Sequence, residues 1–241
     1  MPGLRLLLLS NSTMPGEGYL AWARPHLGIF LGREVRRIFF VPFAGVIRPW
    51  DEYAKVVRSA FGELGYTVVS AHETDDPVAE LLDSDAVAVG GGNTFQLLAK
   101  LNETGLLGAI RGAVRNGMPF VGWSAGSNVA CPTIRTTNDM PIMETPGLGA
   151  LNLIPFQLNA HYTEERLNDH GGETRMDRLN EFVCANPGMP VVALPEGSAL
   201  RVEETEVTLI GRPDAVVYGV NGGPLRVDAA RLKEMGLGVK S

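Results

Sequence analysis

The sequence is poor in the features that define several classes of protein. It has two cysteines, Cys131 and Cys184, in 241 residues, and their spacing matches no metal-ligand motif. Such low cysteine usage predicts a reducing, cytoplasmic location. No lysine and arginine cluster is present and the formal net charge is −6, so we expect neither nucleic acid nor an anionic membrane as a partner. No apolar run approaches the length of a transmembrane helix.

Motifs for bound cofactors are missing as well. There is no His-Glu-x-x-His or cysteine–histidine cluster, and His161 and His170 stand nine positions apart with no further ligand pattern. A P-loop lysine pattern is also absent. The glycines at 90–92 lack the third glycine of a dinucleotide motif, because Phe95 occupies that position. We therefore expect no metal and no cofactor.

Apolar runs alternate with helical patterns through the first half of the chain. Expected strands are residues 4–9, 37–42, 67–70, 86–89 and 119–121, and expected helices are 19–31 (interrupted by Pro25), 50–64, 77–82, 94–101 and 106–116. This alternation predicts a three-layer α/β/α, Rossmann-like fold, with a mostly parallel sheet covered by helices on both faces. In such sheets ligands bind beyond the carboxyl ends of the strands.

The second half is less regular. Residues 131–158 are rich in Pro, Thr, Asn and Gly and predict an irregular excursion, followed by a helix at 174–184. Short apolar runs at 191–194, 199–202, 207–210 and 215–220 predict a mixed or antiparallel finish. Because no repeat, low-complexity segment or linker is present, we expect one domain spanning residues 1–241.

The most informative stretch is Gly-Trp-Ser-Ala-Gly at residues 122–126, which follows a short apolar run. Gly-x-Ser-x-Gly after a buried strand is typical of a nucleophile elbow, a sharp strand-to-helix turn that exposes a serine hydroxyl. The flanking glycines allow backbone angles and close approaches that a Cβ would forbid. Ser124 is therefore the candidate nucleophile.

Serine requires a base to remove its proton, and histidine is the usual one. The chain has four histidines: His26 falls in a helical pattern, His72 ends an early strand, and His170 lies in a turn-like segment. His161 follows the apolar run 158–160 and precedes a segment that resembles a helix start. A position at the end of a strand favours His161 as the base.

A carboxylate should orient the imidazole, and two acids compete for this role. Asp139 lies on the irregular excursion after the serine, and Glu196 follows an expected strand in a hairpin-like turn. The order Ser124, Asp139, His161 matches the order of α/β-hydrolases. Location at a strand's end slightly favours Glu196. Both alternatives stay open.

A second glycine-rich turn, Val-Gly-Gly-Gly-Asn-Thr at residues 89–94, joins an expected strand to an expected helix. Consecutive glycines can direct backbone N–H groups at one point, as an oxyanion hole requires, so Gly91 and Gly92 are candidates. Tight strand–helix packing also explains these glycines and can hold together with the oxyanion role. Asn93 is a candidate both for helix capping and for substrate binding.

Several long segments together resemble the bacterial peptidase E family of α-aspartyl dipeptidases. The segments that carry the resemblance are residues 9–13, 42–46, 50–53, 89–98, 122–126 and 131–141. The resemblance continues to at least residues 194–197 and is far more specific than Gly-x-Ser-x-Gly alone. It implies a class I glutamine amidotransferase-like fold and a cytoplasmic serine peptidase without a cofactor, which releases N-terminal aspartate from Asp-X dipeptides.

The resemblance also implies roles for individual residues. It makes Ser124 the nucleophile and His161 the base, and it supports Gly91 or Gly92 together with the Ala125 N–H as the oxyanion hole. Both Asp139 and Glu196 match positions proposed for the orienting acid. An aspartyl side chain needs a cationic partner, for which Arg135 and Arg175 are candidates because a guanidinium fits a carboxylate in bidentate geometry.

Two alternative functions are compatible with these patterns. One is a cyanophycinase-like β-aspartyl peptidase, and the other is a binding module that keeps an amidotransferase-like scaffold without catalysis. The segment 135–141 favours the dipeptidase, and the joint presence of Ser124, His161 and two acids argues against loss of catalysis. The expected partners are small Asp-X peptides, and the chain is expected to be a monomer or a homodimer.

Overall fold

The computed structural model describes residues 3–165, 171–211, 214–220 and 223–237. Within these residues the strands form a large sheet of seven strands in the order β3-β2-β4-β5-β1-β8-β9. Its members are β1 (Arg5–Leu9), β2 (Arg37–Val41), β3 (Thr67–Ser70), β4 (Ala86–Val89), β5 (Phe120–Trp123), β8 (Ser198–Glu203) and β9 (Glu206–Gly211). The first five strands in chain order run parallel, and β8 and β9 are antiparallel to their neighbours.

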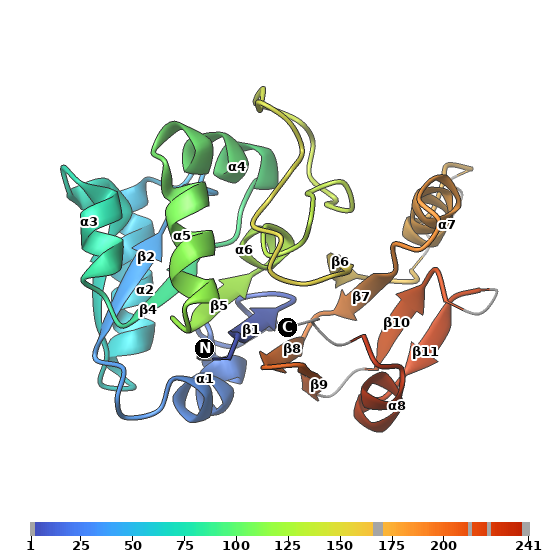
Figure 1. Ribbon diagram of the computed structural model, residues 1–241, viewed down its shortest axis with the longest axis horizontal. Coiled ribbons are helices and arrows are strands. Elements are labelled where there is room, and N and C mark those ends of the chain that lie inside the picture. The colour runs from blue at the N-terminus through green and yellow to red at the C-terminus, as the bar shows by residue number, and fades with distance from the viewer. Residues whose placement is uncertain (1–2, 166–170, 212–213, 221–222, 238–241) are drawn as a thin grey trace.

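The large sheet is covered by helices on both faces, as the strand–helix alternation predicts (Figure 1). The helices of the described residues, on both sheets, are α1 (Arg24–Leu31), α2 (Trp50–Gly62), α3 (Pro77–Leu82), α4 (Thr94–Glu103), α5 (Leu106–Arg115), α6 (Ala125–Asn128), α7 (Arg175–Ala185) and α8 (Ala229–Glu234), with short 3-10 turns at Ala21–Ala23 and Ala71–Glu73. Leu6 and Leu8 of β1 share a core cluster with α4 and α5, whereas Leu7 and Leu9 share one with α1 and α2. Alternate side chains of a strand point to opposite faces, so the all-apolar β1 is buried on both sides.

A smaller sheet was not expected from the sequence. It has the order β11-β10-β7-β6 within the described residues. Its strands are β6 (Gln157–Tyr162), β7 (Val191–Pro195), β10 (Ala215–Tyr218) and β11 (Leu225–Val227). One face packs on α7 through Leu179, and the other joins the main core through Leu158, Val192 and Leu194.

Several expected boundaries differ from the structure for identifiable reasons. Pro25 stands in the first turn of α1 and begins this helix rather than interrupting it, because its fixed φ and missing N–H suit that position. The segment after His161 continues as strand β6 to Tyr162 instead of starting a helix. The turn at Glu196 joins two different sheets and is not a hairpin, since β7 and β8 belong to separate sheets.

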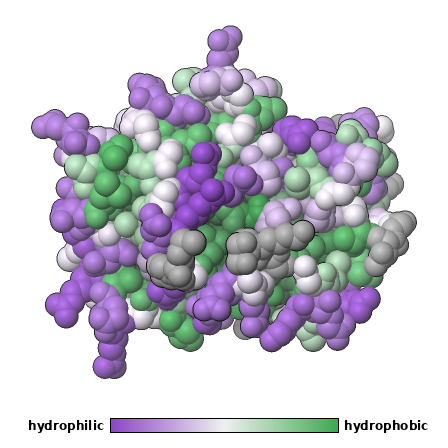
Figure 2. Space-filling model, in the orientation of Figure 1, coloured by the Kyte–Doolittle hydropathy of each residue, from purple (hydrophilic) through white to green (hydrophobic). Residues whose placement is uncertain are grey.

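On the face shown in Figure 2, hydrophilic residues project at the edges and hydrophobic residues lie between them. Among the described residues, no helix has the length and apolar character needed to cross a membrane.

Candidate active site

Ser124 stands on a strained turn between β5 and α6. Its backbone has φ 53° and ψ −115°, and its N–H donates to the Leu9 carbonyl at 3.1 Å. A Cβ added to Gly122 would lie 2.5 Å from the Gly126 oxygen, and one added to Gly126 would lie 2.0 Å from the Val89 oxygen. Only glycine allows such close approaches. The Gly-x-Ser-x-Gly motif therefore forms the sharp elbow expected from the sequence.

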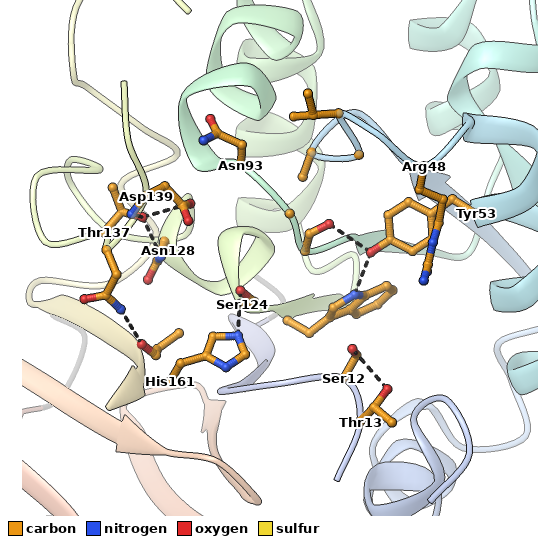
Figure 3. A pocket seen from close by; sticks show the side chains of 18 of the residues that line it. Ser12, Thr13, Arg48, Tyr53, Asn93, Ser124, Asn128, Thr137, Asp139 and His161 are labelled. Carbon is orange, nitrogen blue, oxygen red and sulfur yellow. Dashed lines mark hydrogen bonds between the residues drawn. The ribbon is translucent and has the colours of Figure 1, made fainter. Parts of the chain in front are cut away.

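His161 reaches the serine from the small sheet. Its Nε2 lies 3.0 Å from Ser124 Oγ, and the two side chains face each other in Figure 3. The residue has φ 53° and lies where the pairing of β6 with β7 shifts register. Its backbone N–H donates to Ser10 Oγ at 2.9 Å, and that hydroxyl donates to the Leu194 carbonyl at 2.7 Å. Ser10 thus connects the end of β1 to both β6 and β7.

Glu196 contacts the other nitrogen of the histidine. Its Oε1 lies 2.6 Å from His161 Nδ1, and both side chains are partly exposed. The segment that follows β1 holds the Glu196 turn in place, because the Gly197 N–H donates to Asn11 Oδ1 at 2.9 Å. A carboxylate beside Nδ1 favours the tautomer of His161 in which Nδ1 carries the proton. Nε2 is then free to accept the hydroxyl proton of Ser124.

Asp139, the alternative acid, has different partners. Its Oδ2 accepts hydrogen bonds from the Thr94 N–H at 2.8 Å, from Thr94 Oγ1 at 2.5 Å and from Thr137 Oγ1 at 3.0 Å. A carboxylate in this position accepts from a free N–H group at the start of α4, and the positive end of the helix dipole stabilises its charge. Of the two acids, Glu196 contacts His161, and Asp139 fixes the irregular loop to α4.

A cavity of about 630 Å³ is lined by Ser124, His161, Asp139, Gly91 and Gly92, among other residues. Among the described residues, the backbone N–H groups of Gly91, Gly92 and Ala125 have no backbone hydrogen-bond partner. A Cβ added to Gly91 would lie 3.0 Å from Ser124 Cβ. The glycine turn therefore brings unpaired donors close to the serine, as an oxyanion hole requires.

The two candidate arginines occupy different places. Arg175, the first residue of α7, lines the cavity, and its Nη1 is buried with no hydrogen-bond partner among the described residues. Burial lowers the pKa of Arg175 and the neighbouring Arg178 lowers it further, whereas the Glu196 carboxylate acts in the opposite direction. A buried guanidinium nitrogen without an acceptor is a favourable site for a ligand carboxylate.

Arg135 lies outside the lining of this cavity, in contrast to its predicted role. Its Nη1 donates to Asn186 Oδ1 at 2.7 Å, and its guanidinium carbon lies 5.4 Å from the centre of the Phe182 ring. It therefore ties the excursion to α7. Asn93 does line the cavity, but its Oδ1 accepts from the N–H groups of Phe95 and Gln96, and its Nδ2 donates to the Met140 carbonyl. The Asn93 side chain caps α4 and holds the loop.

Sequence reasoning missed several residues of the site. Asn128 is 4% exposed, lines the cavity, and has an Oδ1 with no partner among the described residues. Arg48 lines the cavity from the loop after β2, and Ser10 and Asn11 organise the histidine and the acid. The position of three of these residues could have indicated them in the sequence, since Arg48, Ser10 and Asn11 follow the carboxyl ends of buried parallel strands.

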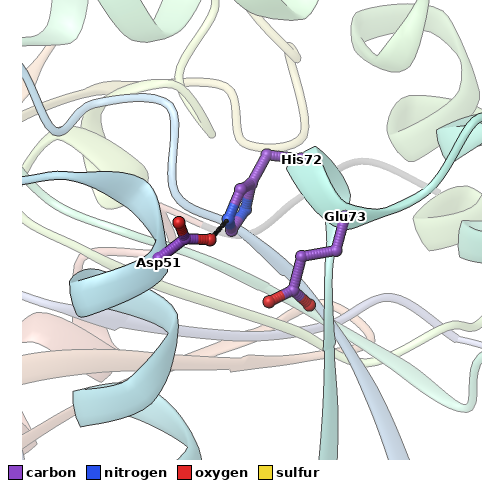
Figure 4. Close-up of side chains that lie close together, drawn as sticks. All are labelled: Asp51, His72 and Glu73. Carbon is purple, nitrogen blue, oxygen red and sulfur yellow. Dashed lines mark hydrogen bonds and ion pairs between the residues drawn. The ribbon is translucent and has the colours of Figure 1, made fainter.

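The other histidines lie elsewhere or are not described. His72 forms a separate group with Asp51 and Glu73 (Figure 4), whose potential ligand atoms lie within 4.8 Å of one another. In this group His72 Nε2 lies 2.9 Å from Asp51 Oδ1, and Glu73 pairs with Arg58. Glu73 Oε2 of this group is thus already paired with a cation. His170 lies outside the described residues.

A serine on a strand-to-helix elbow, bonded to a histidine within an α/β fold, is the arrangement of serine hydrolases as a class. Comparison with known proteins places the chain more narrowly. The sequence model of peptidase family S51 matches residues 6–210, and the chain belongs to this family. It is accordingly a peptidase, and relatives named peptidase E place it in the group that its sequence resembles.

Relatives in sequence and structure agree with this assignment. Peptidase E of a Nostoc species is 50% identical over 214 residues, covering 89% of this chain and 88% of the relative. Peptidase E of Citrobacter koseri is 44% identical over 227 residues, covering 94% of this chain and 98% of the relative. A peptidase from an acI-B1 Actinobacterium superposes with a TM-score of 0.67 at 14% identity, covering 94% of this chain and 95% of that one. This structural similarity concerns the fold alone, and it confirms the predicted α/β fold class.

Proposed function

We propose that the protein is a serine exopeptidase that hydrolyses Asp-X dipeptides through Ser124, His161 and Glu196. The observation that carries the proposal is the continuous chain of contacts from Ser124 Oγ to His161 Nε2 and from His161 Nδ1 to Glu196. The relatives named peptidase E support peptidase chemistry, and the resemblance to α-aspartyl dipeptidases supports the substrate class.

The reaction follows from the roles of these groups. Ser124 Oγ attacks the carbonyl carbon of the aspartyl residue while His161 Nε2 accepts the hydroxyl proton. Glu196 stabilises the resulting imidazolium, and the N–H of Ala125 with that of Gly91 or Gly92 stabilises the oxyanion. His161 then donates its proton to the leaving amine of X. Water hydrolyses the remaining acyl-enzyme by the same steps in reverse.

The polar groups of the cavity suit an N-terminal aspartate. The unpaired nitrogen of Arg175 can bind the β-carboxylate. Among the described residues, Asp139 Oδ1 has no hydrogen-bond partner, because the three bonds of this side chain go to Oδ2. Asn128 Oδ1 likewise has no partner among these residues. We assign these two oxygens to the free ammonium of the substrate. Loop fixing and ammonium binding are compatible roles for the two oxygens of Asp139.

A substrate panel tests the proposal. Asp-Leu should be cleaved, Asn-Leu and Glu-Leu poorly or not at all, and N-acetyl-Asp-Leu not at all. A site built for a carboxylate is left with an unpaired charge by Asn, and Glu is one methylene too long to align its carbonyl with Ser124. Rates on Asn-Leu equal to those on Asp-Leu would contradict the role of Arg175.

The same panel, extended by β-Asp-Arg, separates the alternative functions. Faster cleavage of β-Asp-Arg than of Asp-Leu would favour the cyanophycinase-like reaction. Absence of hydrolysis together with binding of Asp-X would favour the non-catalytic module. We further propose a cytoplasmic location and small peptides as partners, with neither nucleic acid nor membrane bound. A monomer and a homodimer are equally compatible with this proposal.

A further inference from the structure

The cavity extends past Ser124 to a second cationic side chain that the reaction described above does not use. Arg48 lies on the loop between β2 and α2, and its guanidinium carbon lies 5.4 Å from the centre of the Tyr53 ring. Figure 3 shows Arg48 and Tyr53 on one side of Ser124, with Asn128, Thr137 and Asp139 on the other. The cavity therefore has two chemically different ends.

Arg48 is connected to the serine through a short series of contacts. The Tyr53 hydroxyl donates to the Gly91 carbonyl at 3.1 Å and accepts from Trp123 Nε1 at 2.9 Å. Gly91 is the glycine whose added Cβ would touch Ser124. One aromatic ring thus separates the Arg48 guanidinium from the backbone beside the nucleophile. Burial raises the pKa of Tyr53, so this ring stays a neutral surface.

The loop that carries Arg48 is fixed at its base. Gln96 Nε2 donates to the carbonyls of Phe43 and Gly45, at 3.1 and 2.8 Å, and Trp50 Nε1 donates to the Gly45 carbonyl at 3.0 Å. Beyond this base Arg48 is exposed and, among the described residues, forms no ion pair or hydrogen bond; its contact is with the Tyr53 ring. A cation held at a cavity wall without a carboxylate partner is available for an anionic group of a ligand.

The two arginines of the cavity belong to opposite parts of the fold. Arg175 comes from α7 beside the small sheet and interacts electrostatically with Glu196, whereas Arg48 follows β2 of the large sheet (Figure 1). An Asp-X dipeptide likewise carries two carboxylates, the aspartyl side chain and the C-terminus of X. We propose that Arg48 binds the C-terminal carboxylate of X and thereby restricts cleavage to dipeptides.

This inference rests on the proposed function and deepens it. In a dipeptide the carbon next to the Cα of X is a carboxylate, whereas in a longer peptide the same carbon belongs to a neutral amide. Arg48 therefore distinguishes the two by charge. Ile47, which is 96% exposed, and Val46, which is 51% exposed, line the same end and offer apolar contact to the side chain of X.

Paired substrates and matched variants test the assignment. Arg48→Gln is compared with the wild type and with Arg33→Gln, an exposed arginine on the loop after α1. The substrates are Asp-Leu, which has the carboxylate, and Asp-Leu-amide and Asp-p-nitroanilide, which lack it. For Arg48→Gln we expect kcat/KM on Asp-Leu to fall roughly 10- to 100-fold. Rates on the two carboxylate-free substrates should stay within about twofold of wild type, and Arg33→Gln should match wild type throughout.

The outcomes are distinguishable. Equal losses on all three substrates would show that Arg48 only supports the loop, and an unchanged rate on Asp-Leu would show that it does not bind X; either result overturns the assignment. Arg48→Lys should recover part of the preference for Asp-Leu, because it restores the charge without the bidentate geometry. Failure of the wild type on all three substrates would overturn the proposed function itself, and the Arg48 assignment with it.

Discussion

Ser124 and His161 both have a positive φ of 53°, a value that residues other than glycine rarely adopt. Holding a residue other than glycine in this region costs on the order of 1–3 kcal/mol, which the surrounding structure must offset. For Ser124 the contacts of Gly122 and Gly126 enforce the turn, and for His161 the bond from its N–H to Ser10 holds the strand irregularity. In these two conformations Ser124 Oγ and His161 Nε2 lie 3.0 Å apart.

Glu196 and Asp139 should respond differently to loss of charge. Glu196→Gln should lower kcat by roughly 100-fold or more, because an amide cannot stabilise the imidazolium as a carboxylate does. Asp139→Asn should act mainly on KM for Asp-Leu and on stability, because Asp139 fixes the loop to α4 and faces the cavity. Steady-state kinetics and urea denaturation of the two variants separate these effects.

The ranking has a defined counter-result. A wild-type kcat in Glu196→Gln, together with a collapse of kcat in Asp139→Asn, would make Asp139 the orienting acid. Asp83→Asn serves as a charge control, since Asp83 pairs with Arg37 on the surface and lies outside the cavity lining.

The two cysteines should differ sharply in reactivity. Cys131 is buried, and burial raises the pKa of its thiol to about 12, while Cys184 is exposed on α7. Because the thiolate is the reactive form, a thiol reagent at pH 8 should label Cys184 alone in the native protein and both cysteines in denaturant. Cys184→Ser should show no native labelling and full peptidase activity. Rapid native labelling of that variant would contradict the buried position of Cys131.

At the level of elements, periodicity predicted most of the large sheet and its helices. Strands β3 and β4 and helix α3 have the bounds expected from the sequence, because each is a short apolar run or pattern between turn residues. Strand β6 was harder to predict. Polar Asn159 interrupts the apolar pattern of this strand and is nevertheless buried. Its burial depends on a loop distant in sequence, because Asn159 Nδ2 donates to the Thr136 carbonyl and to Asn138 Oδ1.

The packing of the elbow against β4 can be tested with two glycine variants. Gly126→Ala should lower the free energy of unfolding by about 3 kcal/mol or more, because its Cβ would lie 2.0 Å from the Val89 carbonyl oxygen. Gly108→Ala in α5 is the matched control. A Cβ there meets nothing within 4 Å, so alanine should raise stability by up to about 1 kcal/mol. Urea unfolding measures both, and similar effects at the two positions would contradict the close contact.

For the whole molecule, the site lies where the two sheets meet. Ser124 follows a strand of the large sheet, His161 belongs to the small sheet, and Glu196 lies on the turn that joins them. The sequence could predict each residue as the end of an element but could not place β6 and β7 in a separate sheet, because local patterns carry no information on strand order. The choice between Glu196 and Asp139 depended on that arrangement.

Ser10 connects the sheets and offers a test of this arrangement. Ser10→Ala leaves the buried Leu194 carbonyl without this donor and the His161 N–H without its acceptor, which should cost about 1–3 kcal/mol of stability. Activity should fall as well, because the histidine loses its support. Ser84→Ala removes a similar bond to the Glu80 carbonyl far from the site and should cost stability without lowering kcat. Equal kcat in the two variants would separate Ser10 from catalysis.

The most direct test of the serine mechanism combines covalent labelling with Asp-Leu hydrolysis. A fluorophosphonate should add one equivalent to the wild type, peptide mapping should locate the adduct on Ser124, and hydrolysis should be lost in proportion to labelling. Ser124→Ala, with an unchanged circular dichroism spectrum and Tm, should bind no reagent and lose at least about 1,000-fold in kcat. A folded Ser124→Ala protein that still cleaves Asp-Leu at a rate near wild type would contradict the account.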